Sequence, residues 1–391
     1  MFLDDVSAIV CQIGSLRSMI GHVGDEAPFY SFASFYRETE GGDKYSGEDL
    51  LSSLSPTDEI KPLVQERSII SAEETTSLIV NKVFKFGIDP KDYAFLMCLN
   101  DFRSEAEERS KLLECLFEKH NAPASFVIGK QVCSIFATGR QSGICVDVGA
   151  NTSDILPIHE GYSLRKNYCQ VDFGGEYFTN KIKELMGDFP LLHYCQLNRN
   201  QKSDLNSLND ITPLTQLHDK YTDSAYNYCS TIVARKVKEK VFMELKKGET
   251  SISKSIELPD RRTVSIDLED PLSEFFIRGG NCGQGLHIHI NDILNKVDID
   301  VRKSVGSAVV LTGGGSLING FSEILEQKLG FVGAQQTKIR VISSSKTIER
   351  KLAGWIGASI MGSTGAFQNM WISQQEYEES GSRIILQKCL N

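Results

Sequence analysis

The sequence predicts an α/β protein, because strand-like apolar runs alternate with amphipathic helical patterns and one strand-turn-strand pattern occurs twice. A helical pattern over Ser71–Phe86 is followed by a buried strand pattern over Tyr93–Leu99. A second helix follows, opened by a capping-box pattern in which Ser104 precedes Glu107 by three residues. A further capping box, Ser373 with Glu376, predicts a C-terminal helix. At 391 residues the chain is long enough for two domains with separate cores.

The repeated pattern is a hairpin whose turn contains glycine. Its clearer copy has an apolar run at Ile144–Val146 ending in Asp147, a turn over Val148–Asn151 and a second run at Ile155–Ile158. Ile9–Ser15 repeats the order of apolar run, polar residue, apolar residue, glycine and small residue. Such turns direct backbone N–H groups towards one point and can bind phosphate. Two copies on separate lobes predict a polyphosphate held from both sides, although purely structural hairpins have the same sequence pattern.

A third glycine turn lies within Ser307–Gly320, where a strand pattern runs into Gly313, Gly314 and Gly315 and a helix follows. Its apolar residues Phe321, Ile324, Leu325 and Leu329 share one helix face. Glycine lets a nucleotide lie close to the backbone. The spacing matches neither the P-loop nor the dinucleotide-binding fingerprint.

Composition restricts the function classes. The chain carries 51 acidic and 42 basic residues, a net charge of −9, so a surface that coats nucleic acid is not expected. Ten cysteines without CxxC pairs indicate reduced thiols rather than a disulfide or zinc framework. The acidic N-terminal stretch does not resemble a signal peptide, and no apolar run has the length of a membrane span. We therefore expect an intracellular protein.

Three stretches resemble the actin family. They are Val10–Pro28, Gly139–Tyr162 and, most specifically, Glu349–Gly381 with the sequence ERKLAGWIGASIMGSTGAFQNMWISQQEYEESG. The resemblance also includes the glycine turn LTGGGSLINGF. The resemblance implies the actin and Hsp70 fold, in which duplicated ribonuclease-H-like domains form two lobes around a nucleotide cleft. The implied subdomains are 1–32, 67–138 and 353–391 for the first, 33–66 for a shortened second, 139–173 and 272–352 for the third, and 174–271 for the fourth.

Two segments of the second lobe have other patterns. Residues 187–229 are predicted to be an insertion relative to actin, because Gln196–Asp210 has the polar composition of an exposed loop. His287 and His289 alternate in the sequence LHIHI, which predicts a strand with both rings on one side. We expect ordinary strand histidines there, since further metal ligands are not evident.

The resemblance also implies a binding site for ATP or ADP with magnesium. It places the phosphates at Gly14, Ser15 and Gly149, the metal near Asp147 through a bound water, and the adenosine at Gly175, Glu176, Lys238, Glu239, Gly313, Gly314, Gly315 and Lys351. Lys238 and Glu239 belong to a charged amphipathic helix pattern over Val233–Leu245, so a solvated helix face is their alternative. An empty cleft is the alternative for the whole site.

Catalytic positions of the family differ here. Gln12 replaces a metal-binding aspartate, Met19 a phosphate-contacting lysine, Lys130 a water-orienting glutamine and Asp154 a water-positioning histidine. Gln131 could replace the glutamine if the register slips by one residue. Because such residues act as a unit, we expect little or no ATP hydrolysis and assign no catalytic residue.

An apolar groove for a partner helix is implied at the base of the molecule. Its residues are Ile135, Phe136, Ile360, Met361, Thr364, Phe367 and Met370, of which Ile135 and Phe367 are expected to be core. Within the family, the short motifs are most similar to the nuclear actin-related proteins of the fourth class. That similarity implies a nuclear scaffold that binds, together with actin, a helical segment of a remodelling ATPase or a histone acetyltransferase scaffold, with histones as a further contact.

Two other hypotheses remain. One is a cytoplasmic, cytoskeletal actin-like protein, either filament-forming or a motor-cofactor subunit, against which the shortened second subdomain argues. The other is an active ATPase, against which Gln12, Lys130 and Asp154 argue.

Overall fold

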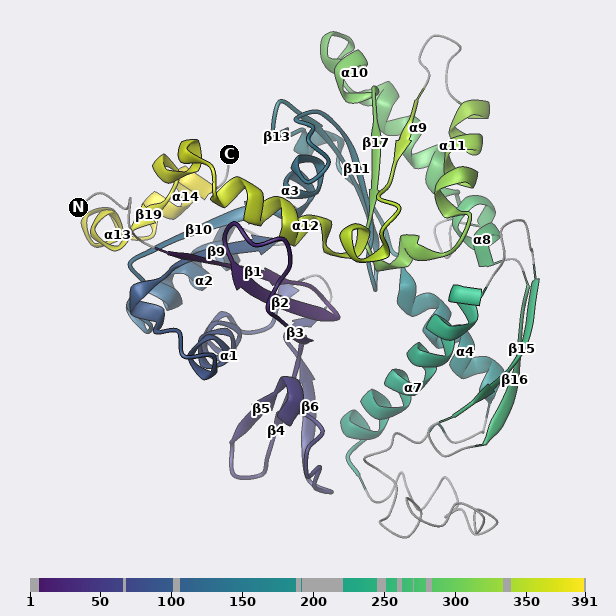
Figure 1. Ribbon diagram of the computed structural model, residues 1–391, viewed down its shortest axis with the longest axis horizontal. Helices are drawn as coiled ribbons and strands as arrows, with labels where there is room; N and C mark the ends of the chain where they lie inside the picture. The colour runs from purple at the N-terminus through teal and green to yellow at the C-terminus, as the bar shows by residue number, and fades with distance from the viewer. Residues whose placement is uncertain are drawn as a thin grey trace.

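The structure is a computed structural model that describes residues 7–65, 68–100, 106–187, 191, 221–244, 251–258, 262–269, 271–278, 283–332 and 339–389. These residues form two α/β lobes, and helix α12 (Thr347–Gly362) runs from one lobe to the other (Figure 1). The chain passes from the first lobe to the second after α3 (Lys130–Phe136) and returns after α12. The predicted two-lobed α/β class is confirmed.

The first lobe is built on a six-stranded sheet. In spatial order its strands are β3 (Tyr30–Ala33), β2 (Arg17–His22), β1 (Ala8–Ile13), β9 (Ala94–Leu99), β10 (Ala124–Gly129) and β19 (Ile372–Ser373). The helices of this lobe are α1 (Ala72–Lys85), α2 (Ala106–Glu118), α3, α13 (Gln374–Ser380) and α14 (Arg383–Cys389). Because β1 and β9 are covered on both faces, almost every residue in them is buried.

The second lobe has a sheet with the same central order. Its strands are β13 (Tyr162–Ser163), β12 (Ser153–His159), β11 (Gly143–Val148), β17 (Val309–Thr312) and β18 (Val341–Ile342), and β14 (Cys169–Val171) also pairs with β12. Its helices are α4 (Gly175–Met186), α7 (Asp223–Glu244), α8 (Pro271–Ser273), a π-helical turn at Glu274–Arg278, α9 (Leu286–Lys296), α10 (Ile299–Val305) and α11 (Phe321–Val332).

The two lobes repeat one topology. In the first, β1 forms an antiparallel hairpin with β2 and pairs in parallel with β9. In the second, β11 forms an antiparallel hairpin with β12 and pairs in parallel with β17. The duplicated hairpin in the sequence is therefore a duplicated position in the fold.

Small sheets extend both lobes. Strands β4 (Phe35–Glu38), β5 (Lys44–Ser46) and β6 (Glu59–Pro62) form a cap on the first lobe, and β15 (Ser251–Glu257) pairs with β16 (Thr263–Glu269) on the second. The short pair β7 (Val64–Gln65) and β8 (Ser68–Ile69) follows the cap. The cap touches α7 and the residue before it: Phe35 packs on Tyr228 of α7 with ring centroids 4.8 Å apart, and Thr222 Oγ1 donates to the Asp58 carbonyl at 2.5 Å.

Helix α12 packs closely against α3 because glycine lies at the contact. A Cβ atom added to Gly357 would lie 1.8 Å from the Cys133 carbonyl oxygen, so a larger residue would force the helices apart. Trp355, on the same helix, is fully buried and donates to the Val10 carbonyl at 3.3 Å.

Several expectations are confirmed and others are corrected. The Ser373–Glu376 capping box begins α13, and Ser71 caps α1. His287 and His289 were predicted in a strand, which is wrong, because they lie on helix α9. At about 100° per residue the two rings leave the helix in different directions rather than on one side.

The expected charged helix over Val233–Leu245 begins earlier, because α7 starts at Asp223. The last seven residues of the predicted insertion, 223–229, are therefore helical, and Gln196–Asp210 lies outside the described residues, as does Ser104. Within the described part of the chain, no helix combines the length and apolarity that a bilayer crossing requires.

Candidate functional site

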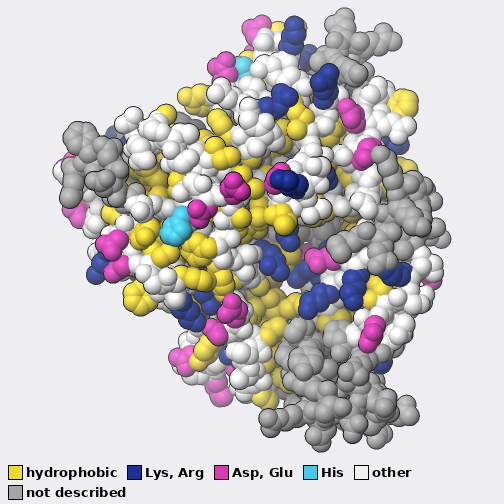
Figure 2. Space-filling view, viewed as in Figure 1, with side chains coloured by type: hydrophobic (Ala, Val, Ile, Leu, Met, Phe, Trp, Pro, Cys, Tyr) yellow, Lys and Arg dark blue, Asp and Glu magenta, His cyan; other side chains and the backbone are white. Residues whose placement is uncertain are grey.

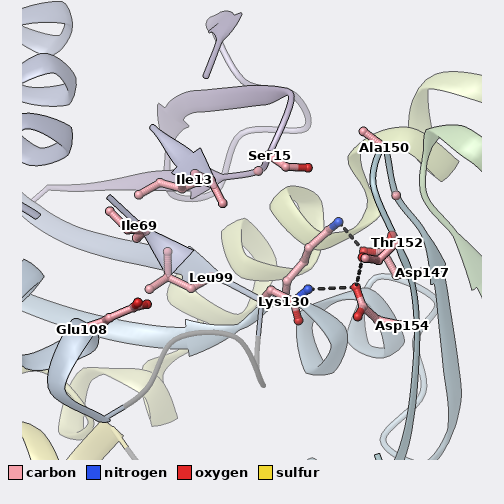
Figure 3. A pocket seen from close by; sticks show the side chains of 14 residues that line it. Ile13, Ser15, Ile69, Leu99, Glu108, Lys130, Asp147, Ala150, Thr152 and Asp154 are labelled. Atoms are coloured by element: carbon pink, nitrogen blue, oxygen red, sulfur yellow. Dashed lines mark hydrogen bonds and ion pairs between the residues drawn. The ribbon is translucent and has the colours of Figure 1, made fainter. Parts of the chain in front are cut away.

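A cavity lies between the two lobes, at the ends of the repeated hairpins (Figure 3). Its volume, including space open to solvent, is about 590 Å³. It is lined by both glycine turns, by the end of β9, by the start of α3 and by strands β11 and β12; the residues are Ile13, Gly14, Ser15, Val64, Ile69, Leu99, Asn100, Glu108, Lys130, Asp147, Gly149, Ala150, Thr152 and Asp154. The predicted phosphate residues Gly14, Ser15 and Gly149 thus meet at one site.

The two turns have the same local geometry. The N–H of Gly14 donates to the Arg17 carbonyl at 3.1 Å, and the N–H of Gly149 donates to the Thr152 carbonyl at 2.8 Å. A Cβ atom would lie 2.8 Å from that carbonyl oxygen in the first turn and 3.0 Å in the second. Glycine is therefore required by this tight turn in each lobe, which explains the repeat in the sequence.

The third glycine turn packs on the second hairpin. Gly313 has a φ of +90°, and a Cβ atom there would lie 2.3 Å from the Val148 carbonyl oxygen. On the other side, the N–H of Gly175 donates to the Gly149 carbonyl at 3.0 Å. These contacts bring the third glycine turn and Gly175 against Gly149. A 3-10 turn over Gly314–Leu317 then leads into α11.

The charged residues expected near adenosine are held by contacts within the second lobe. Lys238 Nζ donates to the Gly175 carbonyl at 2.9 Å and to Thr179 Oγ1 at 3.1 Å, and burial lowers the pKa of Lys238. Glu176 accepts two hydrogen bonds from Arg235, at 2.8 and 2.6 Å. Glu239 and Lys351 are exposed, and neither is among the residues that line the cavity.

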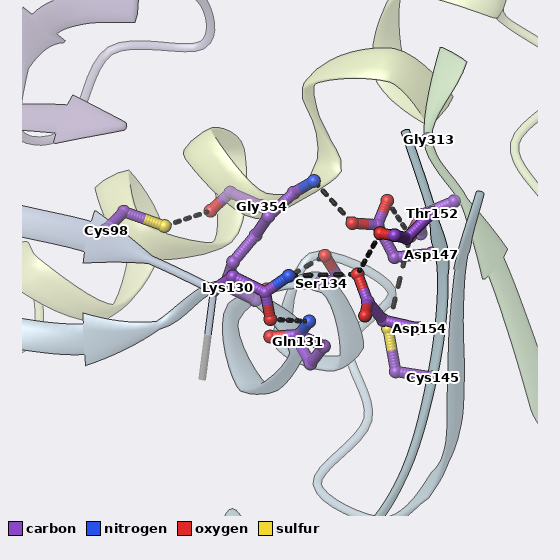
Figure 4. A network of polar contacts seen from close by, with 12 residues as sticks. Cys98, Lys130, Gln131, Ser134, Cys145, Asp147, Thr152, Asp154, Gly313 and Gly354 are labelled. Carbon is purple, nitrogen blue, oxygen red and sulfur yellow. Dashed lines mark hydrogen bonds and ion pairs between the residues drawn. The ribbon is translucent and has the colours of Figure 1, made fainter. Parts of the chain in front are cut away.

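Lys130 crosses the cavity to a carboxylate of the second lobe. Its Nζ atom lies 2.5 Å from Asp147 Oδ2 (Figure 4). The Asp147 side chain is 3% exposed and that of Lys130 is 18% exposed. Burial disfavours the ammonium form of Lys130, but its attraction and hydrogen bond to Asp147 outweigh burial and raise the Lys130 pKa. The charge is therefore retained.

A second set of contacts joins the lobes through Asp154. Its Oδ1 accepts from Tyr168 at 2.6 Å, and its Oδ2 accepts from Asn100 Nδ2 at 2.9 Å. Gln131 Nε2 donates to Asn100 Oδ1 at 2.5 Å. Sequence reasoning missed Asn100 and Tyr168; the position of Asn100 directly after a buried parallel strand is the pattern that could have identified it.

The two altered residues of the first hairpin are buried. Met19 is 5% exposed and contributes to the core of the first lobe, so it does not reach the cavity as a cation would. Gln12 is 4% exposed, and its Oε1 atom has no hydrogen-bond partner among the described residues. Neither side chain brings charge to the phosphate turns.

Comparison with known proteins agrees with this architecture. The family model described as actin matches residues 3–390. The chain belongs to the actin family. Its sequence is 27% identical to Actin-related protein 4 of Arabidopsis thaliana over 443 aligned positions, which cover 99% of each chain. It is 26% identical to Actin-related protein 4 of Oryza sativa subsp. indica over 447 positions, again covering 99% of each chain.

The actin-type cleft of this chain suits an anion. The turns supply glycine-lined backbone from both lobes, and Lys and Arg side chains gather around the hollow between the β4–β6 cap and α7 (Figure 2). The backbone of the two turns and the Lys130 ammonium are therefore the groups in this cavity that could hold an anion, among the carboxylates Glu108, Asp147 and Asp154.

A magnesium ion fits these residues poorly. Mg²⁺ requires oxygen ligands, and it is usually held through one or two carboxylates. Asp147 is already paired with the Lys130 ammonium, and the amide of Gln12 has no charge to offer. No group of three or more His, Cys, Asp or Glu side chains that could hold a metal occurs within the described ranges.

Most residues of the expected partner groove lie at or just after the end of α12, and Ile135 and Phe136 lie at the end of α3. Ile360 is 44% exposed and Met370 is 41% exposed, whereas Phe367 and Ile135 are buried as expected. Thr364 is exposed, and Phe136 and Met361 are half-buried. The apolar side chains of Ile360 and Met370 are therefore exposed to solvent, while Phe367, between them in the sequence, is buried.

Proposed function

We propose that this chain is a non-catalytic nuclear subunit of the actin family that scaffolds chromatin-remodelling or histone acetyltransferase complexes. The Lys130–Asp147 ion pair carries the proposal, because it fills the phosphate end with an ammonium that only donates hydrogen bonds and so cannot accept one from an attacking water. The protein then keeps the actin fold but does not hydrolyse ATP. Similarity over 99% of the chain to Actin-related protein 4 supports a role shared with that class.

A nucleotide in the cleft would be a structural ligand. ATP or ADP bound between the two glycine turns contacts both lobes, so it stabilises their closed arrangement by mass action. The hydrogen bond from Thr222, directly before α7, to the Asp58 carbonyl of the cap shows that the two lobes are in contact.

The partner surface is proposed at the groove beside α12. Ile360 and Met370 would contact the apolar face of a helix from a remodelling ATPase or acetyltransferase scaffold, which also binds actin. Met suits this role because its flexible side chain adapts to different partners. Histones would be a further contact, attracted by the net charge of −9.

Affinity purification of the tagged full-length protein from its own cells, with mass spectrometry of the retained proteins, tests this proposal. We expect actin together with a large helicase-type ATPase or an acetyltransferase scaffold. Recovery of filament or motor-cofactor proteins without chromatin subunits would instead establish the cytoskeletal alternative.

Matched variants locate the surface. The double variant Ile360→Asp with Met370→Asp is expected to lose the helical partner. Ile348→Asp is the control, because Ile348 is 66% exposed on the same helix and lies twelve residues from Ile360, about 18 Å along the axis. Equal loss of the partner in both variants would place the interface elsewhere.

A further inference from the structure

The lysine at the start of α3 is fixed in one place by its surroundings. Its stem passes over Gly354 of α12, where an added Cβ atom would lie 2.5 Å from Lys130 Cγ and 3.0 Å from Gln12 Oε1. The stem therefore lies against α12, and its ammonium group reaches Asp147 at 2.5 Å (Figure 3). This ammonium is a structural part of the cavity wall.

The ammonium occupies the position at which a cation is needed. A polyphosphate between two lobes requires positive charge near its oxygens, and a divalent ion held by carboxylates is one source of that charge. A lysine ammonium is another, since it binds phosphate as a point charge. Lys130 has three N–H donors, and Asp147 is the one acceptor assigned to them among the described residues.

A divalent ion would compete with this lysine. To reach Asp147 through a bound water, the ion would have to approach the Lys130 ammonium, and like charges repel strongly in a partly buried site. Asp154 is also engaged, because it accepts from Tyr168 and Asn100. The acidic side chains of the cavity are thus arranged around protein donors rather than around a metal.

We propose that Lys130 is the built-in cation of this cleft, so that the chain binds an adenosine di- or triphosphate without a divalent metal ion. This inference rests on the nucleotide of the proposed function and specifies how it is bound. Phosphate oxygens receive hydrogen bonds from the Lys130 ammonium and from backbone N–H groups of the two glycine turns.

Titration of the full-length protein with a fluorescent ATP analogue, in excess EDTA and again in excess Mg²⁺, tests the inference. For the natural sequence we expect dissociation constants that agree within about twofold. Binding that requires Mg²⁺ would overturn the inference.

Lys130→Gln is expected to weaken binding in EDTA by about tenfold and to make the remaining binding stronger when Mg²⁺ is added. Lys130→Arg keeps a positive charge and should retain most of the metal-free binding. Lys303→Gln is the matched control, because Lys303 is exposed on α10 and does not line the cavity. If Lys130→Gln does not fold, the comparison of EDTA with Mg²⁺ on the natural sequence still decides.

The outcomes separate this inference from the scaffold role. No nucleotide binding under either condition would overturn the metal-free site and leave the partner experiment unaffected. Metal-free binding without any chromatin partner would support the site and contradict the scaffold. An unchanged affinity in Lys130→Gln would show that Lys130 only positions Asp147.

Discussion

Lys130 Nζ and Asp147 Oδ2 lie 2.5 Å apart, although one residue begins a helix of the first lobe and the other belongs to a strand of the second. An ammonium and a carboxylate at this distance, both largely removed from water, form a charge-assisted hydrogen bond across the cleft. The pair therefore links the two lobes beside the two glycine turns, where the resemblance to actin implies the phosphates of a nucleotide.

Removing the carboxylate of this pair should destabilise the protein. Asp147→Asn leaves the Lys130 ammonium without its partner, and we expect the free energy of unfolding to fall by about 2 to 3 kcal/mol, since Lys130 keeps some contact with water. Urea unfolding followed by fluorescence measures this change. Combining Asp147→Asn with Lys130→Met removes both charges and should recover most of the loss. Unchanged stability of Asp147→Asn would show that the pair contributes nothing.

The contact between α12 and α3 should tolerate no side chain at Gly357. Gly357→Ala places a methyl group 1.8 Å from the Cys133 carbonyl oxygen, so we expect a loss of about 3 kcal/mol despite the better helix propensity of alanine. Gly365→Ala is the control, because nothing lies within 4 Å of its added Cβ atom. Thermal unfolding of both variants compares them directly. Equal melting temperatures would contradict the close packing described for these helices.

Stability should decrease as the pH falls, in part through helix α9. Burial lowers the pKa of His287, with Lys328 and His289 adding to the effect. Burial also lowers the pKa of His289, and the opposing attraction of Asp292 is smaller. In the unfolded chain both rings protonate near their usual pKa of about 6.5.

Because the folded pKa values are the lower ones, the unfolded state binds more protons as the pH falls through that range, and the folded state loses stability. Unfolding of the natural sequence and of His287→Gln with His289→Gln at about pH 7.5 and about pH 5.5 measures the contribution. The natural sequence should lose about 1 kcal/mol more than the double variant. If both proteins lose the same stability between the two pH values, the histidines are not the cause.

Hydrolysis of ATP should be absent. With Gln12, Lys130 and Asp154 at the altered positions, we expect no phosphate release above a blank without protein, whereas actin in the same assay provides the positive signal. Lys130→Gln alone should not restore release, because residues that position water and metal act together. Release that depends on the natural protein and disappears in Asp147→Ala would contradict this expectation.

The duplicated hairpins and the α/β class could both be predicted from local sequence patterns. Gly14 and Gly149 predict tight turns because neither turn has room for a side chain, and that constraint involves only a few neighbouring residues. The buried strand over Ala94–Leu99 and the capping box of Ser373 with Glu376 are likewise set by neighbouring residues, so periodicity and spacing predicted them.

The helical state of the histidine segment and the contacts between the lobes depend on residues that are distant in the chain. The alternation of His287 and His289 matched a strand, but packing of Leu286, Ile290 and Ile293 into the second core made that segment a helix. The partners of Lys130 and of Asn100 come from different lobes, 17 and 54 residues away in the chain, and no local rule relates them. The pairing arises because folding brings both groups into one cavity, where burial makes an unpaired charge costly and selects the opposite charge as its neighbour.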